Sequence, residues 1–428
     1  MTQFTDPLEW LFGLEQFGIK LGLGNINALL DALGHPERTF TSVHVAGTNG
    51  KGSVAAMADT ALRAAGHRSA RYTSPHLVDL SERFLIDGRR VEGAALGAAV
   101  GELRDIVDQL RRDGVLDVQP TFFEVTTAVA FELFRRARVD VAVCEVGLGG
   151  RLDATNVLEP AVAAITSIGL DHQQYLGTTL RDIAREKAGI IKRGIPVVVG
   201  RMDSGARAVI VECAEACGAP VVDAWDGVDV ARLATRIRVR TAERDYGEIA
   251  LALAGDHQID NAVVAVRLLE LVGTRGVPVP ATAIRQGLQE AVWPARLDLR
   301  RLPDGREALL DAAHNPDGAA ALAAFLTSRA FMGCPLVFGA MRDKNAAGML
   351  QALAPVVSSM IMTRASNARS ADPEELAALA RQAAPHLPVA VHPVLSDALA
   401  AAWRQSPRIV VAGSIFLLGD VMREFGWS

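Results

Sequence analysis

Short runs of β-branched and other apolar residues alternate with longer amphipathic segments along most of the chain. In the first half of the chain we expect four of these runs to form strands: 42–46, 139–146, 161–168 and 196–200. The segments between them, such as 53–66 and 126–137, space their apolar residues at the period of a helix. This alternation predicts βαβ units and a mostly parallel sheet, and so the α/β class.

The second half of the chain shows one interruption and then the same rhythm. Segment 236–253 has two alternating runs about a polar centre, which predicts an antiparallel hairpin. Between Pro294 and Asp304 the pattern has two prolines and no clear period, so we place a domain boundary there. Beyond it we expect five more strands: 307–313, 334–340, 358–365, 388–393 and 408–414. The division predicts a larger domain over 1–295 and a smaller, Rossmann-like α/β domain over 296–428.

Composition narrows the class of protein. A chain of 428 residues exceeds the size at which single cores stop growing, and 50% hydrophobic with 22% charged residues is typical of a globular protein. A net charge of −5 predicts no nucleic-acid partner, so any site for an anion must be locally basic. The acidic N-terminus does not resemble a signal peptide and no apolar run could span a bilayer, so we expect a cytoplasmic protein without a membrane partner. The four cysteines have no metal-binding spacing.

Residues 47–53, Gly-Thr-Asn-Gly-Lys-Gly-Ser, lie between an expected strand and a helix expected from about Ser53. Such a turn directs backbone N–H groups and the positive end of the helix at an anion. Lys51 adds a charge for phosphates and Ser53 a hydroxyl for a metal ion. The spacing differs from the common phosphate loop, because two residues rather than four separate Gly47 from Gly50, and Gly52 follows the lysine. A permissive glycine turn is the alternative, but we favour phosphate binding and hence a P-loop-type first domain.

Polar residues also follow other expected strands, at the sheet edge where α/β proteins bind ligands. Glu145 ends the strand 139–146, and its carboxylate could reach Mg²⁺ held between phosphates. The loop after it contains Arg151, Asp153 and Asn156. This loop either covers a ligand or is a solvated surface loop, and its polar density after a buried strand favours the ligand.

The remaining candidates have open roles. His172 follows Asp171 after a strand, and taken alone it is better interpreted as a core histidine than as a metal ligand. Asp311 and His314 could bind a ribose or a charged substrate, although helix capping by Asn315 is the competing explanation. Taken alone, Lys187 indicates only a surface lysine.

Together these motifs resemble the folylpolyglutamate synthase and dihydrofolate synthase family within the muramyl ligase superfamily. The resemblance rests on VHVAGTNGKGSV, SPHL, TFFEVTTAVAFELF, EVGLGGRLDATN, LDHQQYLG, REKAGIIK, HQIDNA, WPARLD, DAAHNPDGA, FGAMRDKN and AGSIFLLGDV, in that order. The unusual spacing of GTNGKGS is similar to this family's own phosphate loop. The resemblance implies an ATP-binding domain with the pterin-substrate site over 1–295 and a ligase domain with the glutamate site over 296–428.

The resemblance also implies a role for each matching residue, with Lys51, Lys187 and His314 as catalytic residues. It implies that the nucleotide is bound by Gly47, Thr48, Asn49, Gly50, Lys51, Gly52, Ser53, Asn261, Arg296 and Asp311. It implies that metal ions are bound by Ser53, Glu145, His172 and Lys187, the lysine as a carbamate. It implies that the folate substrate is bound by Ser74, His76, Arg83, Thr121, Phe123 and Asp153, and glutamate by His314 and Ser414.

One position departs from the family's pattern. Ala295 stands in WPARLD where the family usually has glycine. If this position needs a positive φ, alanine is strained there, which affects the geometry of Arg296.

The implied reaction is ATP-dependent addition of L-glutamate to dihydropteroate, to folate polyglutamates, or to both, through an acyl phosphate with release of ADP and phosphate. The implied cofactors are ATP and Mg²⁺, with two ions and room for a monovalent cation, and the implied state is a monomer. We favour a bifunctional enzyme. A muramyl-type ligase acting on a different carboxylate is the alternative, but it would usually need a substrate domain before Gly47. A nucleotide switch leaves the second-domain motifs without a purpose, and the loop spacing disfavours a P-loop kinase.

Overall fold

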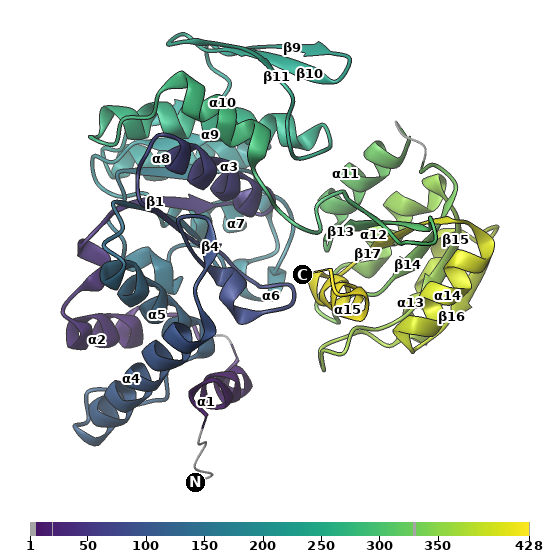
Figure 1. Cartoon of the computed structure of the whole chain (residues 1–428), viewed down its shortest axis with the longest axis horizontal. Helices are drawn as coiled ribbons and strands as arrows, with labels where there is room; N and C mark the ends of the chain where they lie inside the picture. Colours follow the sequence, from purple (N-terminus) through teal and green to yellow (C-terminus); the bar gives the residue numbers. More distant parts are fainter. Residues whose placement is uncertain (1–5, 19, 328–330, 428) are drawn as a thin grey trace. The chain divides into compact units, whose positions relative to one another are not determined.

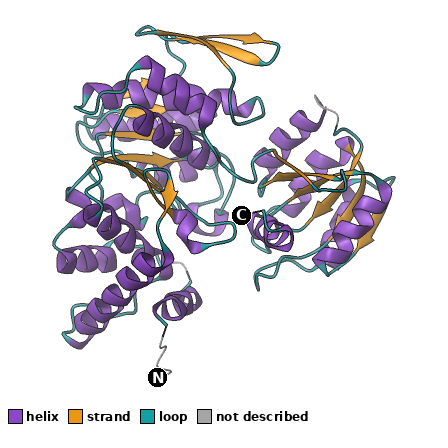
Figure 2. Ribbon diagram, in the orientation of Figure 1, coloured by secondary structure: helices purple, strands orange, loops and turns teal. Residues whose placement is uncertain are grey.

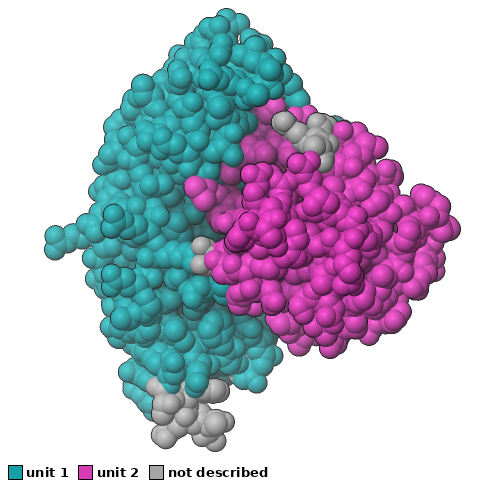
Figure 3. All heavy atoms as spheres, turned by 45° about the vertical axis from the view of Figure 1, so that its right-hand side comes forward, with its two compact units in different colours: residues 1–168, 180–252, 260–291 teal, residues 169–179, 253–259, 292–428 magenta. Residues whose placement is uncertain are grey.

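The structure is a computed structural model that describes residues 6–18, 20–327 and 331–427. The described chain forms two compact units (Figure 3). The first contains 1–168, 180–252 and 260–291, and the second contains 169–179, 253–259 and 292–428. The main division thus falls after Ala291, where the sequence predicted one after Ala295, and two short inner segments belong with the second unit. Among the described residues, no helix is both long and apolar enough to cross a membrane.

The first unit is built on an eight-stranded sheet with the order β4-β3-β2-β5-β1-β6-β7-β8. Its strands are β1 (Thr41–Ala46), β2 (Ser69–Tyr72), β3 (Phe84–Ile86), β4 (Arg89–Arg90), β5 (Val141–Glu145), β6 (Val162–Ile165), β7 (Val197–Val199) and β8 (Val221–Asp223). All neighbours from β2 to β8 pair in parallel, and only β3 and β4 are antiparallel. The central strands are buried along almost their whole length, which explains why they are continuous apolar runs rather than alternating ones.

Helices cover this sheet (Figure 2). They are α1 (Pro7–Gly13), α2 (Gly24–Leu33), α3 (Lys51–Ala64), α4 (Gly93–Arg112), α5 (Phe122–Arg136), α7 (Leu180–Ala188), α8 (Ser204–Ala216), α9 (His257–Thr274) and α10 (Ala281–Glu290). The core between the sheet and α1, α2, α4 and α5 includes Tyr72, Phe131 and Cys144. Helix α3 contacts the central strands and packs against α10, so its first turn, which follows the glycine loop, is held by the core.

A separate antiparallel sheet, β9 (Asp229–Leu233), β10 (Arg236–Arg240) and β11 (Asp245–Ile249), lies beside α10 (Figure 1). The predicted hairpin is confirmed as β10 and β11. Strand β9 was not predicted, because its residues are mostly exposed and carry no alternating pattern. Only its pairing with β10 makes it a strand.

The second unit is a six-stranded sheet with the order β12-β13-β17-β14-β15-β16. Its strands are β12 (Asp298–Arg301), β13 (Glu307–Asp311), β14 (Cys334–Phe338), β15 (Val357–Met362), β16 (Val389–Val391) and β17 (Arg408–Ala412). Its helices are α6 (Gln173–Leu176), α11 (Pro316–Thr327), α12 (Ala346–Leu353), α13 (Pro373–Ala383), α14 (Leu395–Gln405) and α15 (Ile415–Phe425). The five predicted strands are all present and pair in parallel. Strand β12 is an antiparallel edge strand in the stretch interpreted as a linker, and half of its residues are exposed.

Candidate active site

The glycine loop follows β1 directly, and two of its glycines are required by their surroundings. Gly47 has φ +150°, and a Cβ there would lie 1.9 Å from the Thr166 hydroxyl oxygen. Gly50 has φ +89° and caps α3, and a Cβ there would lie 2.2 Å from the Asn261 side-chain oxygen. Helix α3 begins at Lys51, two residues earlier than the pattern predicted. The loop therefore places the start of α3, whose first N–H groups have no carbonyl partner within the helix itself, at the carboxyl edge of the parallel sheet.

Lys51 and Glu145 lie together at this edge. Strand β5 pairs with β1 so that Glu145 is opposite Val45, two residues before the loop. The Lys51 ammonium donates hydrogen bonds to the carbonyl oxygens of Gly47 at 3.1 Å and Thr48 at 3.3 Å, and lies 3.8 Å from the Glu145 carboxylate. Glu145 also accepts a 3.4 Å hydrogen bond from the Ser74 N–H. A cation and an acceptor-rich carboxylate thus flank the loop, as a site for phosphates and a metal ion requires.

Lys187 is a buried residue of α7, only 5% exposed, and not a surface lysine. Its ammonium donates a 2.9 Å hydrogen bond to the carbonyl of Gly47. The end of α7 packs closely on the loop after β5, since a Cβ on Gly150 would lie 2.9 Å from the Lys187 carbonyl oxygen. The side-chain amide of Asn156 stabilises this contact, because it donates hydrogen bonds to the carbonyls of Arg151 and Gly189 at 2.9 and 3.0 Å. The residue that the sequence alone left without a role therefore contacts the phosphate loop.

The predicted metal ligands come from both units. Ser53 and Glu145 belong to the first unit and are buried, and His172 belongs to the second, so their convergence stays a prediction. Within the described residues, no three His, Cys, Asp or Glu side chains form a metal cage. The donors still fit Mg²⁺, which usually binds through one or two carboxylates and substrate phosphates rather than an all-protein cage.

The predicted folate residues surround the carboxyl ends of β2 and β5. The Arg83 guanidinium donates to His76 Nδ1 at 3.0 Å and lies 5.0 Å from the Phe122 ring centroid. Its burial lowers the pKa of Arg83. Phe123 stacks on Tyr72 with centroids 6.1 Å apart and covers Gly147, where a Cβ would lie 2.4 Å from the ring.

Two of these folate residues already have structural partners. Thr121 caps α5 in a capping box with Glu124, so its hydroxyl is engaged by the protein itself. Asp153 accepts from the N–H groups of Leu148 and Thr155 at 2.8 and 3.0 Å, and burial raises its pKa. The side chains of both residues are therefore held by hydrogen bonds within the protein itself.

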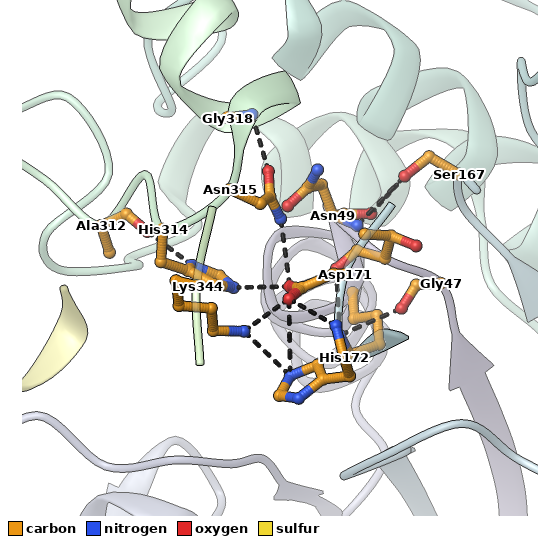
Figure 4. Close-up of polar contacts among 12 residues, drawn as sticks. Gly47, Asn49, Ser167, Asp171, His172, Ala312, His314, Asn315, Gly318 and Lys344 are labelled. Atoms are coloured by element: carbon orange, nitrogen blue, oxygen red, sulfur yellow. Dashed lines mark hydrogen bonds and ion pairs between the residues drawn. The ribbon is translucent and has the colours of Figure 1, made fainter. Parts of the chain in front are cut away.

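In the second unit, the Asp171 carboxylate is the centre of a buried polar cluster (Figure 4). It lies 2.5 Å from the Lys344 ammonium, 3.4 Å from His314 Nε2 and 3.2 Å from the Asn315 side-chain nitrogen. Lys344 also lies 3.1 Å from His172 Nε2. Burial by itself raises the pKa of Asp171, but the hydrogen bond and charge of His314, with the charges of His172 and Lys344, hold it well below its usual range. Asp171 and Lys344, to which the sequence analysis gave no role, thus bring the predicted residues His172 and His314 together.

Replacing Asp171 with alanine is expected to lower the free energy of unfolding by about 3 kcal/mol, because the Lys344 ammonium would stay buried without its carboxylate. Urea denaturation of the full chain measures this. The double replacement Asp171→Ala/Lys344→Met should cost less than the sum of the single ones, and strict additivity would contradict the pairing.

The contribution of Asp171 to the free energy of unfolding depends on pH, because its pKa is lowered on folding. This contribution is present above the unfolded-state pKa of about 4 and is lost as the pH falls through the folded-state pKa.

The other predicted residues of the second unit lie at strand ends. Asp311 is buried, and its two oxygens accept the N–H groups of Leu297 and Ala313, each at 2.9 Å, while burial raises its pKa. Asn315 caps α11 through the N–H of Gly318 at 2.8 Å, which confirms the capping explanation for this residue. Ser414 caps α15 through the N–H of Phe416 at 3.2 Å.

Ala295 has φ +58°, so the position does adopt the left-handed conformation that favours glycine. Its neighbour Arg296 donates a 3.1 Å hydrogen bond to the Ala295 carbonyl. The N–H of Leu297 is held by Asp311, which fixes the turn next to the arginine. Alanine is therefore accommodated by the surrounding contacts.

Sequence reasoning assigned no role to four residues of these sites: Asp171, Lys344, Thr166 and Ser167. Lys344 lies in FGAMRDKN, a motif that supported the resemblance without receiving a role. Thr166 and Ser167 lie in ITSIGLDH, a few residues before Asp171, and their hydroxyls contact the phosphate loop. The position of each after a buried strand was the available signal.

Comparison with known proteins agrees with this geometry. The Mur ligase middle domain family matches residues 117–269, and the Mur ligase glutamate ligase domain family matches residues 295–415. A dihydrofolate synthase/folylpolyglutamate synthase of Bacillus subtilis is 36% identical over 367 residues, which is 84% of each chain. The crystal structure of Mycobacterium tuberculosis folylpolyglutamate synthase complexed with ADP and AMPPCP is 35% identical, with a TM-score of 0.90 over 98% of this chain and 99% of that one.

A bifunctional folylpolyglutamate synthase/dihydrofolate synthase with Mn, AMPPNP and L-glutamate bound is 30% identical, with a TM-score of 0.86 over 99% of this chain and 98% of that one. The fold and the two matched domains define this protein as a Mur ligase. Within that superfamily, the chain belongs to the folylpolyglutamate synthase and dihydrofolate synthase family.

Proposed function

We propose that this chain catalyses the ATP-dependent addition of L-glutamate to dihydropteroate, to folate polyglutamates, or to both, through an acyl phosphate that releases ADP and phosphate. The observation that supports this most directly is the phosphate loop with Lys51 and Glu145 beside it, in a chain of this ligase family. Relatives bound to ADP, AMPPNP, Mn and L-glutamate support ATP, a divalent metal ion and glutamate as ligands here. A Mur-type ligase acting on a different carboxylate is the alternative.

The proposed chemistry needs phosphoryl transfer to a carboxylate and then attack by an amine. Phosphoryl transfer depends on positioning and on neutralising charge, which is the role of the loop N–H groups and Lys51. Mg²⁺ would be held by Ser53, Glu145, His172 and a carbamylated Lys187, and it would neutralise phosphate charge. We propose two such ions and a monovalent cation.

The substrates are assigned to sites at the carboxyl edges of the two sheets. The folate site is proposed at Ser74, His76, Arg83, Thr121, Phe123 and Asp153, and the glutamate site at His314 and Ser414. The nucleotide site adds Asn261, Arg296 and Asp311 to the loop. Asn261 is supported by its packing against Gly50, and Arg83 by its buried cation beside an aromatic ring. We further propose that the protein acts as a monomer in the cytoplasm.

Product analysis with both acceptors tests this function. Purified protein is incubated with ATP, Mg²⁺ and L-glutamate, with dihydropteroate in one reaction and tetrahydrofolate in another, and the products are separated by mass. We expect one glutamate added to dihydropteroate and further glutamates added to tetrahydrofolate. Product from a single acceptor would restrict the proposal to one activity. No product from either, with glutamate-dependent ADP release on another carboxylate, would favour the alternative.

A further inference from the structure

Two hydroxyl groups hold a single peptide group of the phosphate loop. The Thr166 hydroxyl donates a 2.6 Å hydrogen bond to the carbonyl of Asn49, and the Ser167 hydroxyl donates a 3.0 Å hydrogen bond to the same oxygen. The contact of Asn49 with Ser167 is visible in Figure 4. Thr166 is only 5% exposed, so its hydroxyl has little access to water as a competing partner.

The sheet fixes where these two hydroxyls lie. Thr166 and Ser167 come directly after β6, and β6 pairs in parallel with β1, with Ile165 opposite Ala46. The loop leaves β1 at the next residue. Ser167 is also bonded to the loop through its backbone, since its carbonyl accepts the Thr48 N–H at 2.8 Å and its hydroxyl lies 3.1 Å from the Asn49 nitrogen. Two neighbouring residues of the loop are therefore held to the end of β6.

Holding the Asn49 carbonyl also sets the direction of the next N–H group. In a trans peptide the C=O and N–H bonds of one peptide group point in opposite directions. With the Asn49 oxygen directed at Thr166 and Ser167, the Gly50 N–H points away from β6, and the structure records no hydrogen bond from it to any described residue. Gly50 has φ +89°, a region in which glycine moves readily, so the backbone itself does not fix this peptide.

We propose that Thr166 and Ser167 are positioning residues of the phosphate loop, whose hydroxyls preorganise the Gly50 N–H as a donor to the nucleotide phosphates. The inference rests on the role proposed above for the loop. It adds two residues that act through the loop backbone and touch no substrate themselves. Preorganised N–H donors lose less entropy and reorganise less when the anion binds, so loss of the hydroxyls should weaken phosphate binding specifically.

Nucleotide binding by calorimetry tests this proposal. Thr166→Val and Ser167→Ala are made singly and together in the full chain, and ATP with Mg²⁺ and adenosine are titrated separately. The double variant loses every hydrogen bond that the two hydroxyls make with Asn49, so we expect ATP affinity to fall about tenfold. Adenosine has no phosphate, and its affinity should stay unchanged. The conservative Thr166→Ser keeps the hydroxyl and should restore ATP affinity, and the KM for glutamate should not change in any of these variants.

The controls separate positioning from packing. Thr363→Val makes the same substitution at a fully buried threonine of the second unit, whose hydroxyl has no hydrogen-bond partner among the described residues, and should leave ATP affinity unchanged. Ser167→Ala removes a partly exposed hydroxyl with little change in packing, so it tests the idea even if the double variant does not fold. Equal losses for ATP and adenosine, or no loss for ATP, would overturn the positioning role.

Lys51→Ala separates this failure from a failure of the proposed function. If Lys51→Ala binds ATP as tightly as the wild type, the loop is not the phosphate site and both proposals fail. If Lys51→Ala weakens ATP binding while Thr166→Val/Ser167→Ala does not, only the positioning role is wrong. Weaker ATP binding in both supports the two proposals together.

Discussion

Replacing Lys51 with alanine is expected to reduce ligase activity by on the order of 10²-fold or more, the usual effect of removing a preorganised group that stabilises transition-state charge. The Lys51 ammonium contacts only loop carbonyls and the Glu145 carboxylate among the partners that the structure gives it. It is therefore available to turn toward an anion. Initial rates with saturating ATP and both acceptors measure the effect.

The Lys51→Ala fold should remain intact, because among the described residues Glu145 is the one ionic partner of this lysine, and Glu145 also accepts the Ser74 N–H. Thermal unfolding close to that of the wild type would confirm this. Lys51→Arg is a useful companion, because it keeps the charge but changes its shape and should recover only part of the activity. A Lys51→Ala enzyme that ligates at nearly the wild-type rate would show that the loop has been assigned wrongly.

Most of the parallel strands were predictable, namely β1, β5, β6 and β7 of the first unit and all five of the second, because burial on both faces makes such strands continuous apolar runs. The short parallel strands β2 and β8 were not predicted. Strands β9 and β12 were not, since their side chains are largely exposed and their formation depends on one paired neighbour. The sequence pattern also gave no sign that residues 169–179 belong to the second unit. This assignment follows from the contacts of Asp171 with His314 and Lys344, which are far away in the sequence.

In the candidate site, too, some side chains could be placed from the sequence and others could not. Glu145 and the glycine loop could be placed from the sequence, because a residue at the end of a buried strand lies at the carboxyl edge of the sheet. The hydroxyls of Thr166 and Ser167 could not, since serine and threonine after a strand are common and only the register with β1 brings them to Asn49. Lys187 had no signal of its own in the helical pattern, and its burial appears only in the folded chain.

Replacing Lys187 with alanine is expected to leave the enzyme nearly inactive. The buried ammonium donates to the carbonyl of Gly47, inside the loop that we propose binds phosphates and Mg²⁺. An unmodified ammonium would repel the metal ion, because the repulsion between two like charges a few ångströms apart amounts to several kcal/mol at low effective dielectric. Reaction of the amine with CO₂ would give a carbamate, which reverses the charge and supplies the oxygen ligands that Mg²⁺ prefers.

Short carboxylates such as acetate should therefore restore part of the activity of Lys187→Ala, since they can supply the missing oxygens. Lys192→Ala is a matched control, because Lys192 lies five residues further on and its ammonium donates to the carbonyl of Asn156 instead. Acetate should not change its activity. A direct readout is electron density extending past Nζ of Lys187 in crystals grown near or above neutral pH. An active Lys187→Ala enzyme, together with an unmodified Lys187, would end the carbamate hypothesis, but the phosphate loop and the folate site would stand, because neither depends on it.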